Sequence, residues 1–62
     1  MRQVFYPGEL TEAIAITGGD AHHLAHVMRT QIGDVITVVD AAGQAAEMAV
    51  TALTRDVVHL RM

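Results

Sequence analysis

The sequence predicts a mostly β domain in which a small antiparallel barrel is plugged by one short helix. Three observations support this prediction. The chain has 62 residues, which fits one small domain. Apolar residues make up 52% of it, so it can pack a core rather than stay disordered. Short β-branched or alternating runs are separated by turn residues, and only one segment shows helical spacing.

Two short strands are expected before the helix. The stretch RQVFY at residues 2–6 reads as a strand that ends at Pro7-Gly8, because proline cannot donate to a ladder and glycine favours a turn. AIAIT, at residues 13–17, is a second and weaker strand.

A helix is expected from Asp20 to about Thr30. Gly18-Gly19 interrupts the preceding strand, and Asp20 can act as the N-cap because its carboxylate accepts a free backbone N–H. Four apolar residues then recur at helical spacing and predict a face toward the core: Ala21, Leu24, Ala25 and Met28.

The second half predicts consecutive hairpins. A turn at residues 32–34 leads into the β-branched run VITVVD at residues 35–40. Asp40-Ala-Ala-Gly43 has hairpin chemistry, with Gly43 free to adopt positive φ. The side chains of residues 44–53 alternate between two faces, as in a strand. Residues 57–62 form a last strand after the turn at residues 54–56. The inward side chains are expected to be Met48, Val50, Ala52, Val58, Leu60 and Met62.

Composition narrows the function. There is no cysteine, so neither a disulfide nor a thiolate zinc site can form. The net charge is −3 with four arginines and no lysine, so the chain alone should bind nucleic acid weakly. No leader peptide or membrane span is recognisable, which favours a cytoplasmic protein without membrane contact.

Three histidines on the helix raise the question of a metal. His22 and His26 are four residues apart, so both rings could reach one ion. A catalytic zinc site needs a third protein ligand, and nothing in the spacing requires His59, Asp20 or Asp40 to supply it. The sequence therefore predicts no metal site. A nucleophilic triad is not expected either, because the chain contains neither serine nor cysteine and its threonines lie in strands and turns.

Arg29 and the histidines each allow two interpretations. The histidines could be solvated residues on the outer helix face. Arg29 could cap carbonyls at the helix C-terminus, or its guanidinium could recognise two phosphate oxygens. Spacing alone does not favour either role for Arg29.

The order of these pieces resembles one family. Strand RQVFY, the helix start TGGDAHHL, the stretch HVMR, the turn GD, VITVVD, a D-x-x-G hairpin and a final VHL strand follow one another along the chain. This order is similar to the N-terminal domain of the RsmE family, bacterial enzymes that make 3-methyluridine in 16S ribosomal RNA. The resemblance covers residues 1–62 and implies a small PUA-like antiparallel β-barrel that binds RNA.

The resemblance also implies site residues and partners. Arg2, His22, His23 and Arg29 match family positions expected to face RNA. The family's second, SPOUT domain would bind S-adenosylmethionine and form the homodimer, so this chain alone should lack cofactor and activity and help to position 16S ribosomal RNA.

Two departures from the family pattern concern turns. Ile32 stands where the family often has proline, and residues 54–56 carry one arginine where lysines are common. The second departure suggests that most RNA affinity resides in the other domain.

One alternative function belongs to another class of protein. Strand-rich sequence such as GDVITVV also suits a stand-alone dimeric β-barrel, an interaction module of a small transcriptional regulator. A knotted C-terminal domain further along the parent reading frame would exclude this alternative.

Overall fold

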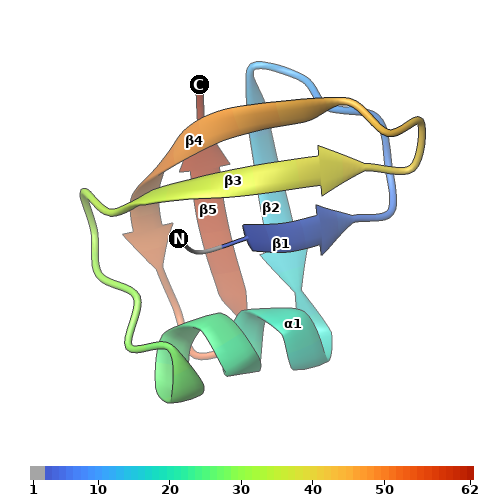
Figure 1. Cartoon of the computed structure of the whole chain (residues 1–62). Coiled ribbons are helices and arrows are strands. Elements are labelled where there is room, and N and C mark those ends of the chain that lie inside the picture. Colours follow the sequence, from blue (N-terminus) through green and yellow to red (C-terminus); the bar gives the residue numbers. More distant parts are fainter. Residues whose placement is uncertain (1–2) are drawn as a thin grey trace.

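The computed structural model describes residues 3–62, and Arg2 therefore lies outside the described residues. The elements in chain order are β1 (Gln3–Tyr6), β2 (Ala13–Thr17), α1 (Gly18–His22), the π-helix η1 (His23–Val27), β3 (Val35–Asp40), β4 (Ala45–Leu53) and β5 (Val57–Arg61). The two helical segments follow each other without a break and form the single short helix that the sequence predicts (Figure 1).

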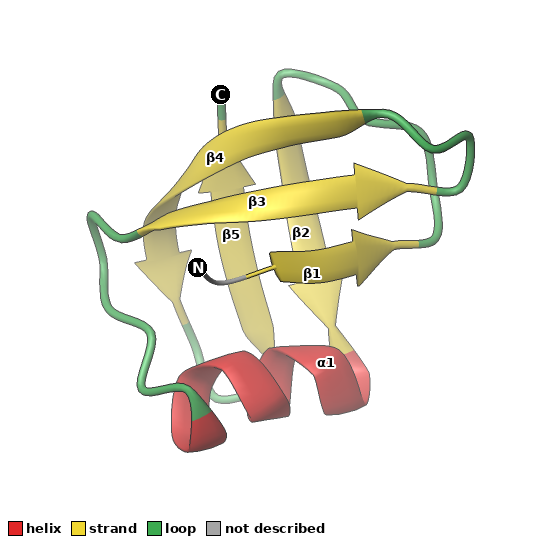
Figure 2. Ribbon diagram, in the orientation of Figure 1, coloured by secondary structure: helices red, strands yellow, loops and turns green. Residues whose placement is uncertain are grey.

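One curled sheet contains all the strands of the described chain, in the order β1-β3-β4-β5-β2. The sheet bends around so that β2 and β5 lie behind β1 and β3, and the helix crosses the lower end of this half-barrel (Figure 2). The mostly β, barrel-like fold class is thus confirmed. One detail differs from the expected antiparallel arrangement, because β1 pairs with β3 in parallel.

The parallel pair follows from the path of the chain. β1 and β3 are separated by β2 and the helix, so the chain can return in the same direction, whereas a tight hairpin would force an antiparallel pair. β1 and β2 become the two edges of the sheet, and no hydrogen-bonded ladder between them is seen in residues 3–62.

The core lies between the curled sheet and the helix. Alternate residues of the strands point inward, as expected from their period of two. Within the described residues, the buried apolar side chains are Ile14, Ile16, Ala21, Leu24, Ile36, Val38, Met48, Val50, Val58 and Leu60. Three of the four residues of the predicted helix face are confirmed, with Ala21 and Leu24 buried and Met28 packed against the core, while Ala25 is only partly buried.

The helix begins earlier than the sequence suggested. Thr17 occupies the N-cap position with extended backbone, and its side chain makes no capping hydrogen bond. Asp20 is instead inside the first turn, so the prediction of Asp20 as N-cap is wrong. Its carboxylate still lies near the positive end of the helix dipole. α1 therefore follows β2 without an intervening loop, and Gly18 at this junction has φ of 68°.

A β-bulge in β4 changes which side chains face the core. The register with β5 shifts between Val50 and Ala52, so Ala52 pairs with the exposed His59 and Leu53 pairs with the buried Val58. Leu53 packs against the core, in place of the predicted Ala52. An extra residue in one strand reverses the alternation beyond it.

Met62 also departs from the predicted inward set. It lies past the end of β5 and is 57% exposed, because no strand continues around it. Its backbone N–H donates to the Glu12 carbonyl at 2.9 Å, which ties the end of the described chain to the loop before β2.

Asp40 holds the β3–β4 hairpin against the loop that follows β1. Its carboxylate is 1% exposed and accepts the backbone N–H groups of Ala42 and Gln44 on Oδ1 and that of Leu10 on Oδ2. The Gly43 N–H donates to the Asp40 carbonyl at 3.1 Å, and Gly43 has φ of 83°, as the hairpin prediction required. The D-x-x-G motif is thus a structural anchor.

Candidate functional site

The helix carries its histidines on the side facing solvent. His22, His23 and His26 are all exposed, while Ala21 and Leu24 of the same helix are buried. The rings of His22 and His26 contact each other, with centroids 4.4 Å apart and planes tilted by 33°. Sequence reasoning gave His26 no role, although its i,i+4 spacing from His22 was a usable signal.

The second half of the helix is widened. The Met28 N–H donates to the His23 carbonyl at 3.0 Å, five residues back, and the Thr30 N–H donates to the Leu24 carbonyl at 3.0 Å. The first bond is the π-helix pattern, which occurs mostly in short pieces and frequently at functional sites. Because these two bonds satisfy carbonyls near the C-terminus, the helix end does not need a side-chain cap there.

Arg29 lies just past the helix, at the residue after its C-cap, Met28. It has φ of 52°, the left-handed conformation that helices usually assign to glycine at this position. For a residue with a Cβ this conformation costs about 1–2 kcal/mol. The Arg29 side chain is exposed, and within residues 3–62 it forms no ion pair. The backbone terminates the helix, so the guanidinium is left available for another partner.

Arg55 lies at the same end of the molecule as the helix. Val57 pairs with Thr17, the residue just before α1, so the turn at residues 54–56 adjoins the helix start. Figure 1 shows this β4–β5 connection beside the helix at the bottom of the sheet. The side chain of Arg55 is exposed and, among the described residues, has no ion-pair partner.

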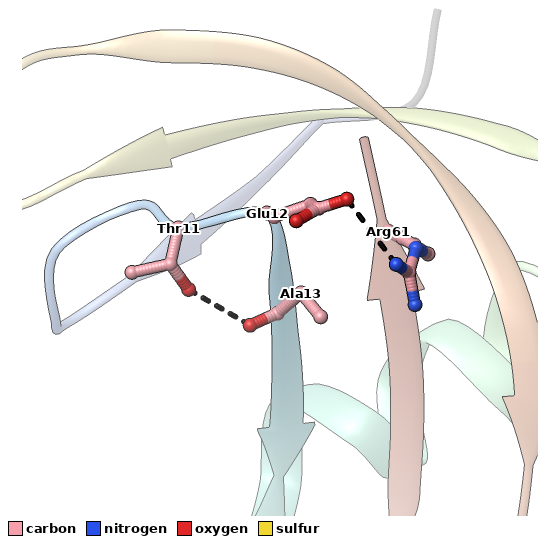
Figure 3. A network of polar contacts seen from close by, with 4 residues as sticks. All are labelled: Thr11, Glu12, Ala13 and Arg61. Atoms are coloured by element: carbon pink, nitrogen blue, oxygen red, sulfur yellow. Dashed lines mark hydrogen bonds and ion pairs between the residues drawn. The ribbon is translucent and has the colours of Figure 1, made fainter.

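Arg61 is different from these two arginines. Its Nη2 contacts Oε1 of Glu12 at 3.2 Å, at the opposite end of β5 (Figure 3). The Thr11 hydroxyl donates to the Ala13 carbonyl at 2.8 Å in the same loop. The described arginines without an acidic partner, Arg29 and Arg55, are therefore both at the helix end.

Among the described residues, the structure brings no third metal ligand to His22 and His26. Among residues 3–62, no three histidine, aspartate or glutamate side chains gather in a metal-binding group. Asp40, one of the donors considered from the sequence, is buried in the hairpin and accepts backbone N–H groups. His59 is exposed on β5 and pairs across the sheet with Ala15 and Ala52.

A hollow opens between the free edges of β1 and β2, beside the start of the helix. Its volume is about 90 Å³, and it is lined by Phe5, Tyr6, Pro7, Ala15, Ile16, Thr17 and Asp20. Pockets that enclose cofactor-sized ligands usually measure about 300–1,000 Å³. The hollow is too small and too open for S-adenosylmethionine, so it does not fit that cofactor.

The family of the chain is identified by a match of its sequence to a family model. It matches the family model described as the RNA methyltransferase PUA domain over residues 16–62. The chain belongs to this family. The expectation of a PUA-like domain from an RNA methyltransferase is confirmed, and it is favoured over the regulator module. A comparison with curated proteins gave no match.

Solved structures contain the same PUA fold. A Neisseria gonorrhoeae ribosomal RNA small subunit methyltransferase E, bound to S-adenosylmethionine, is 22% identical with a TM-score of 0.84, over 98% of this chain and 26% of that one. A predicted RNA methyltransferase of Thermotoga maritima is 19% identical with a TM-score of 0.83, over 100% of this chain and 28% of that one.

A third structure, described as a hypothetical protein, is 25% identical with a TM-score of 0.89, over 97% of this chain and 27% of that one. The PUA domain therefore spans roughly a quarter of the length of these structures. Within its described residues, no helix is long and apolar enough to cross a membrane.

Proposed function

We propose that this PUA domain is the N-terminal RNA-binding part of an RsmE-type enzyme that makes 3-methyluridine in 16S ribosomal RNA. Membership of the RNA methyltransferase PUA domain family supports RNA as the partner. S-adenosylmethionine and the homodimer contact belong to a second domain in this proposal, and the protein acts in the cytoplasm. The PUA domain itself performs no chemistry and helps to position the RNA.

The observation that carries the proposal is the backbone of Arg29. An arginine with left-handed backbone after a helix is less stable than a glycine at the same place. The exposed side chain of Arg29 has no ion-pair partner within residues 3–62. Residues held in costly conformations cluster at functional sites. A guanidinium offers a planar fork of donors that matches two phosphate oxygens. We therefore assign Arg29 to a phosphate of the RNA.

The histidines of the helix complete the proposed contact. His22 and His23 are exposed on the helix that Arg29 follows, and His26 extends the set through its ring contact with His22. An imidazole can stack on an unpaired base and hydrogen-bond to it. Arg2 is proposed as a further contact from the family resemblance alone, since it lies outside the described residues.

Two substitutions of Arg29 test the assignment. Arg29→Gly removes the backbone cost, so we expect it to stabilise the domain by about 1 kcal/mol, which raises Tm by about 4–8 °C in a domain of this size. RNA affinity should nevertheless fall. Arg29→Lys keeps the charge and the backbone cost but loses the planar fork, so it should bind more weakly at unchanged Tm.

The measurements are thermal unfolding and filter binding to a 16S ribosomal RNA fragment. Arg61→Lys is the matched control, because Arg61 is paired with Glu12 at the other end. If Arg29→Gly gains stability and binds RNA like the wild type, Arg29 is not a contact and the proposed surface is wrong.

A further inference from the structure

The hollow between β1 and β2 holds the aromatic residues of the chain. The sequence contains one phenylalanine, one tyrosine and no tryptophan, and both Phe5 and Tyr6 line this hollow. Phe5 is 56% exposed, whereas Tyr6 is half-buried and packs against the core. The buried core is aliphatic. Exposed aromatic surface at one concave place is a stacking platform for planar ligands.

The Tyr6 ring is held in place by Gly8. A Cβ at Gly8 would lie 2.9 Å from Cε2 and 3.3 Å from the hydroxyl of Tyr6, so the ring rests directly on the glycine backbone. The following loop is fixed in turn, because the Ala41 N–H lies 3.5 Å from the Gly8 carbonyl and the Leu10 N–H donates to Asp40. The ring of Tyr6 is therefore held in one position.

Hydrogen-bonding groups face the same space. Asp20, in the first helical turn, lines the hollow with an exposed carboxylate. The described strands β1 and β2 each form a ladder on one side only, with β3 and β5 respectively, so their other backbone edges border the hollow. A carboxylate accepts hydrogen bonds and attracts amino groups, whereas it repels a phosphate.

We propose that this hollow binds one unpaired RNA base that carries an exocyclic amino group, as cytosine and adenine do. This inference rests on the proposed function, because that function makes RNA the partner. The base stacks against the exposed ring of Phe5, next to Tyr6, and its amino group donates to the Asp20 carboxylate. The negative charge of Asp20 keeps the backbone phosphate outside the hollow, where Arg29 and the histidines are placed to receive neighbouring phosphates and bases.

Tyr6 gives a direct readout of this site. It is the chain's single tyrosine and there is no tryptophan, so the intrinsic fluorescence of the chain comes from Tyr6. Single-stranded tetranucleotides of cytosine, adenine and uracil are titrated into the chain, with fluorescence and the amide NMR shifts followed together. We expect the cytosine and adenine forms to quench Tyr6, to shift the amides of Phe5 and Asp20, and to bind more tightly than the uracil form.

Two variants separate stacking from base choice. Phe5→Leu keeps an apolar side chain but removes the ring, and we expect it to weaken cytosine and adenine binding at least about fivefold, the lower limit for loss of one stacking contact. Asp20→Asn offers an amide that can donate to a carbonyl, so it should shift the preference toward uracil. Glu47→Gln makes the same charge change on an exposed strand residue outside the hollow and should leave the order of affinities unchanged.

The outcomes distinguish this inference from the proposed function. If Arg29→Gly weakens RNA binding while Phe5→Leu and Asp20→Asn bind all three oligonucleotides like the wild type, the hollow does not hold a base and only this inference fails. If neither Arg29→Gly nor the hollow variants change binding, both fail. A preference for uracil in the wild type would also overturn the inference, because Asp20 would then face a carbonyl.

Discussion

Asp40 is a buried carboxylate whose described hydrogen-bond donors are backbone N–H groups. Burial raises its pKa, but the N–H groups of Leu10, Gln44, Ala42 and Gly43 together lower it further, so the net pKa lies below the ordinary value of 3.8. Two loops that are far apart in sequence depend on this one ionised group, because Leu10 belongs to the loop before β2 and the other donors to the β3–β4 hairpin.

The direction of this shift predicts a pH dependence. A folded-state pKa below the unfolded one contributes stability that is present above the unfolded pKa, about 3.9, and is lost as pH falls through the folded value. Asp40→Asn removes the charged acceptor, so we expect a lower Tm at pH 7 and a smaller further loss between pH 5 and pH 2. Thermal unfolding as a function of pH measures both effects.

Glu47→Gln is the control for this prediction, because Glu47 is exposed on β4. It should keep the Tm of the wild type at pH 7. If Asp40→Asn loses stability in acid as steeply as the wild type, the carboxylate of Asp40 is not the group responsible.

The β3–β4 hairpin is the element whose turn chemistry is clearest. Gly43 has φ of 83°, and a Cβ built on it would meet no atom within 4 Å. Any cost of Gly43→Ala therefore comes from the backbone conformation and not from a clash. We expect the variant to lose about 1 kcal/mol of stability, or roughly 4–8 °C in Tm.

Gly19→Ala is the matched control for the hairpin. Gly19 lies in α1, also has no atom within 4 Å of a built Cβ, and has no positive φ. Alanine favours a helix over glycine, so Tm should stay the same or rise. Equal losses in the two variants would mean that the backbone conformation of Gly43 is not what the hairpin requires.

Elements with strong local signals could be predicted from the sequence. β3 was recognisable because its β-branched run and the following D-x-x-G turn agree. The bulge in β4 was not, because the shift that places Leu53 inward depends on pairing with β5. The helix start was misplaced because a good capping residue, Asp20, was present and Thr17 caps without its side chain.

The candidate site was predictable in part for similar reasons. The spacing of His22 and His26 was enough to predict that their rings lie on one face, and they are in contact. The left-handed backbone of Arg29 could not be predicted, because arginine has no preference for that conformation. The hollow could not be predicted either, since it forms between β1 and β2, whose positions as sheet edges depend on long-range pairing.

Arginines and acidic residues lie together at the helix end of the molecule, because Asp20 is in α1 and Asp56 follows Arg55. The net charge of the chain is −3, yet Arg29 and Arg55, both without ion pairs in the described chain, lie at the helix end. Arg61 is neutralised by Glu12 at the other end. Phosphate contacts in single-stranded RNA contribute about −0.7 each to the slope of log affinity against log salt. Contacts by Arg29 and Arg55 together contribute about −1.4 to this slope.

Filter binding of the wild type and three arginine variants at several salt concentrations measures this slope. Arg29→Ala and Arg55→Ala should each flatten it by about 0.7, whereas Arg61→Ala should leave it unchanged. A slope that responds to Arg61 and not to Arg29 would place the RNA at the opposite end of the molecule.

The parallel pairing of β1 has a consequence for the order of folding. Val39 pairs with Ala45 across a short hairpin, whereas Gln3 pairs with Thr37, a partner 34 positions later in the chain. Closing the longer loop costs more entropy, and β1 gains one ladder of four residue pairs in return. We expect β1 to dock after the β3–β4 hairpin has formed, and to be the first strand to detach from the folded domain.

Native-state hydrogen exchange measures this expectation. The amides of β1 that bond to β3 should exchange faster than those of β3 that bond to β4, and equal rates would show that the sheet opens as one unit. Because β1 carries Phe5 and Tyr6, each detachment of β1 from the sheet also removes one side of the hollow. A base that binds there would bind only molecules with β1 in place, and it would therefore slow this exchange. RNA binding would then stabilise the attachment of the first strand to the rest of the sheet.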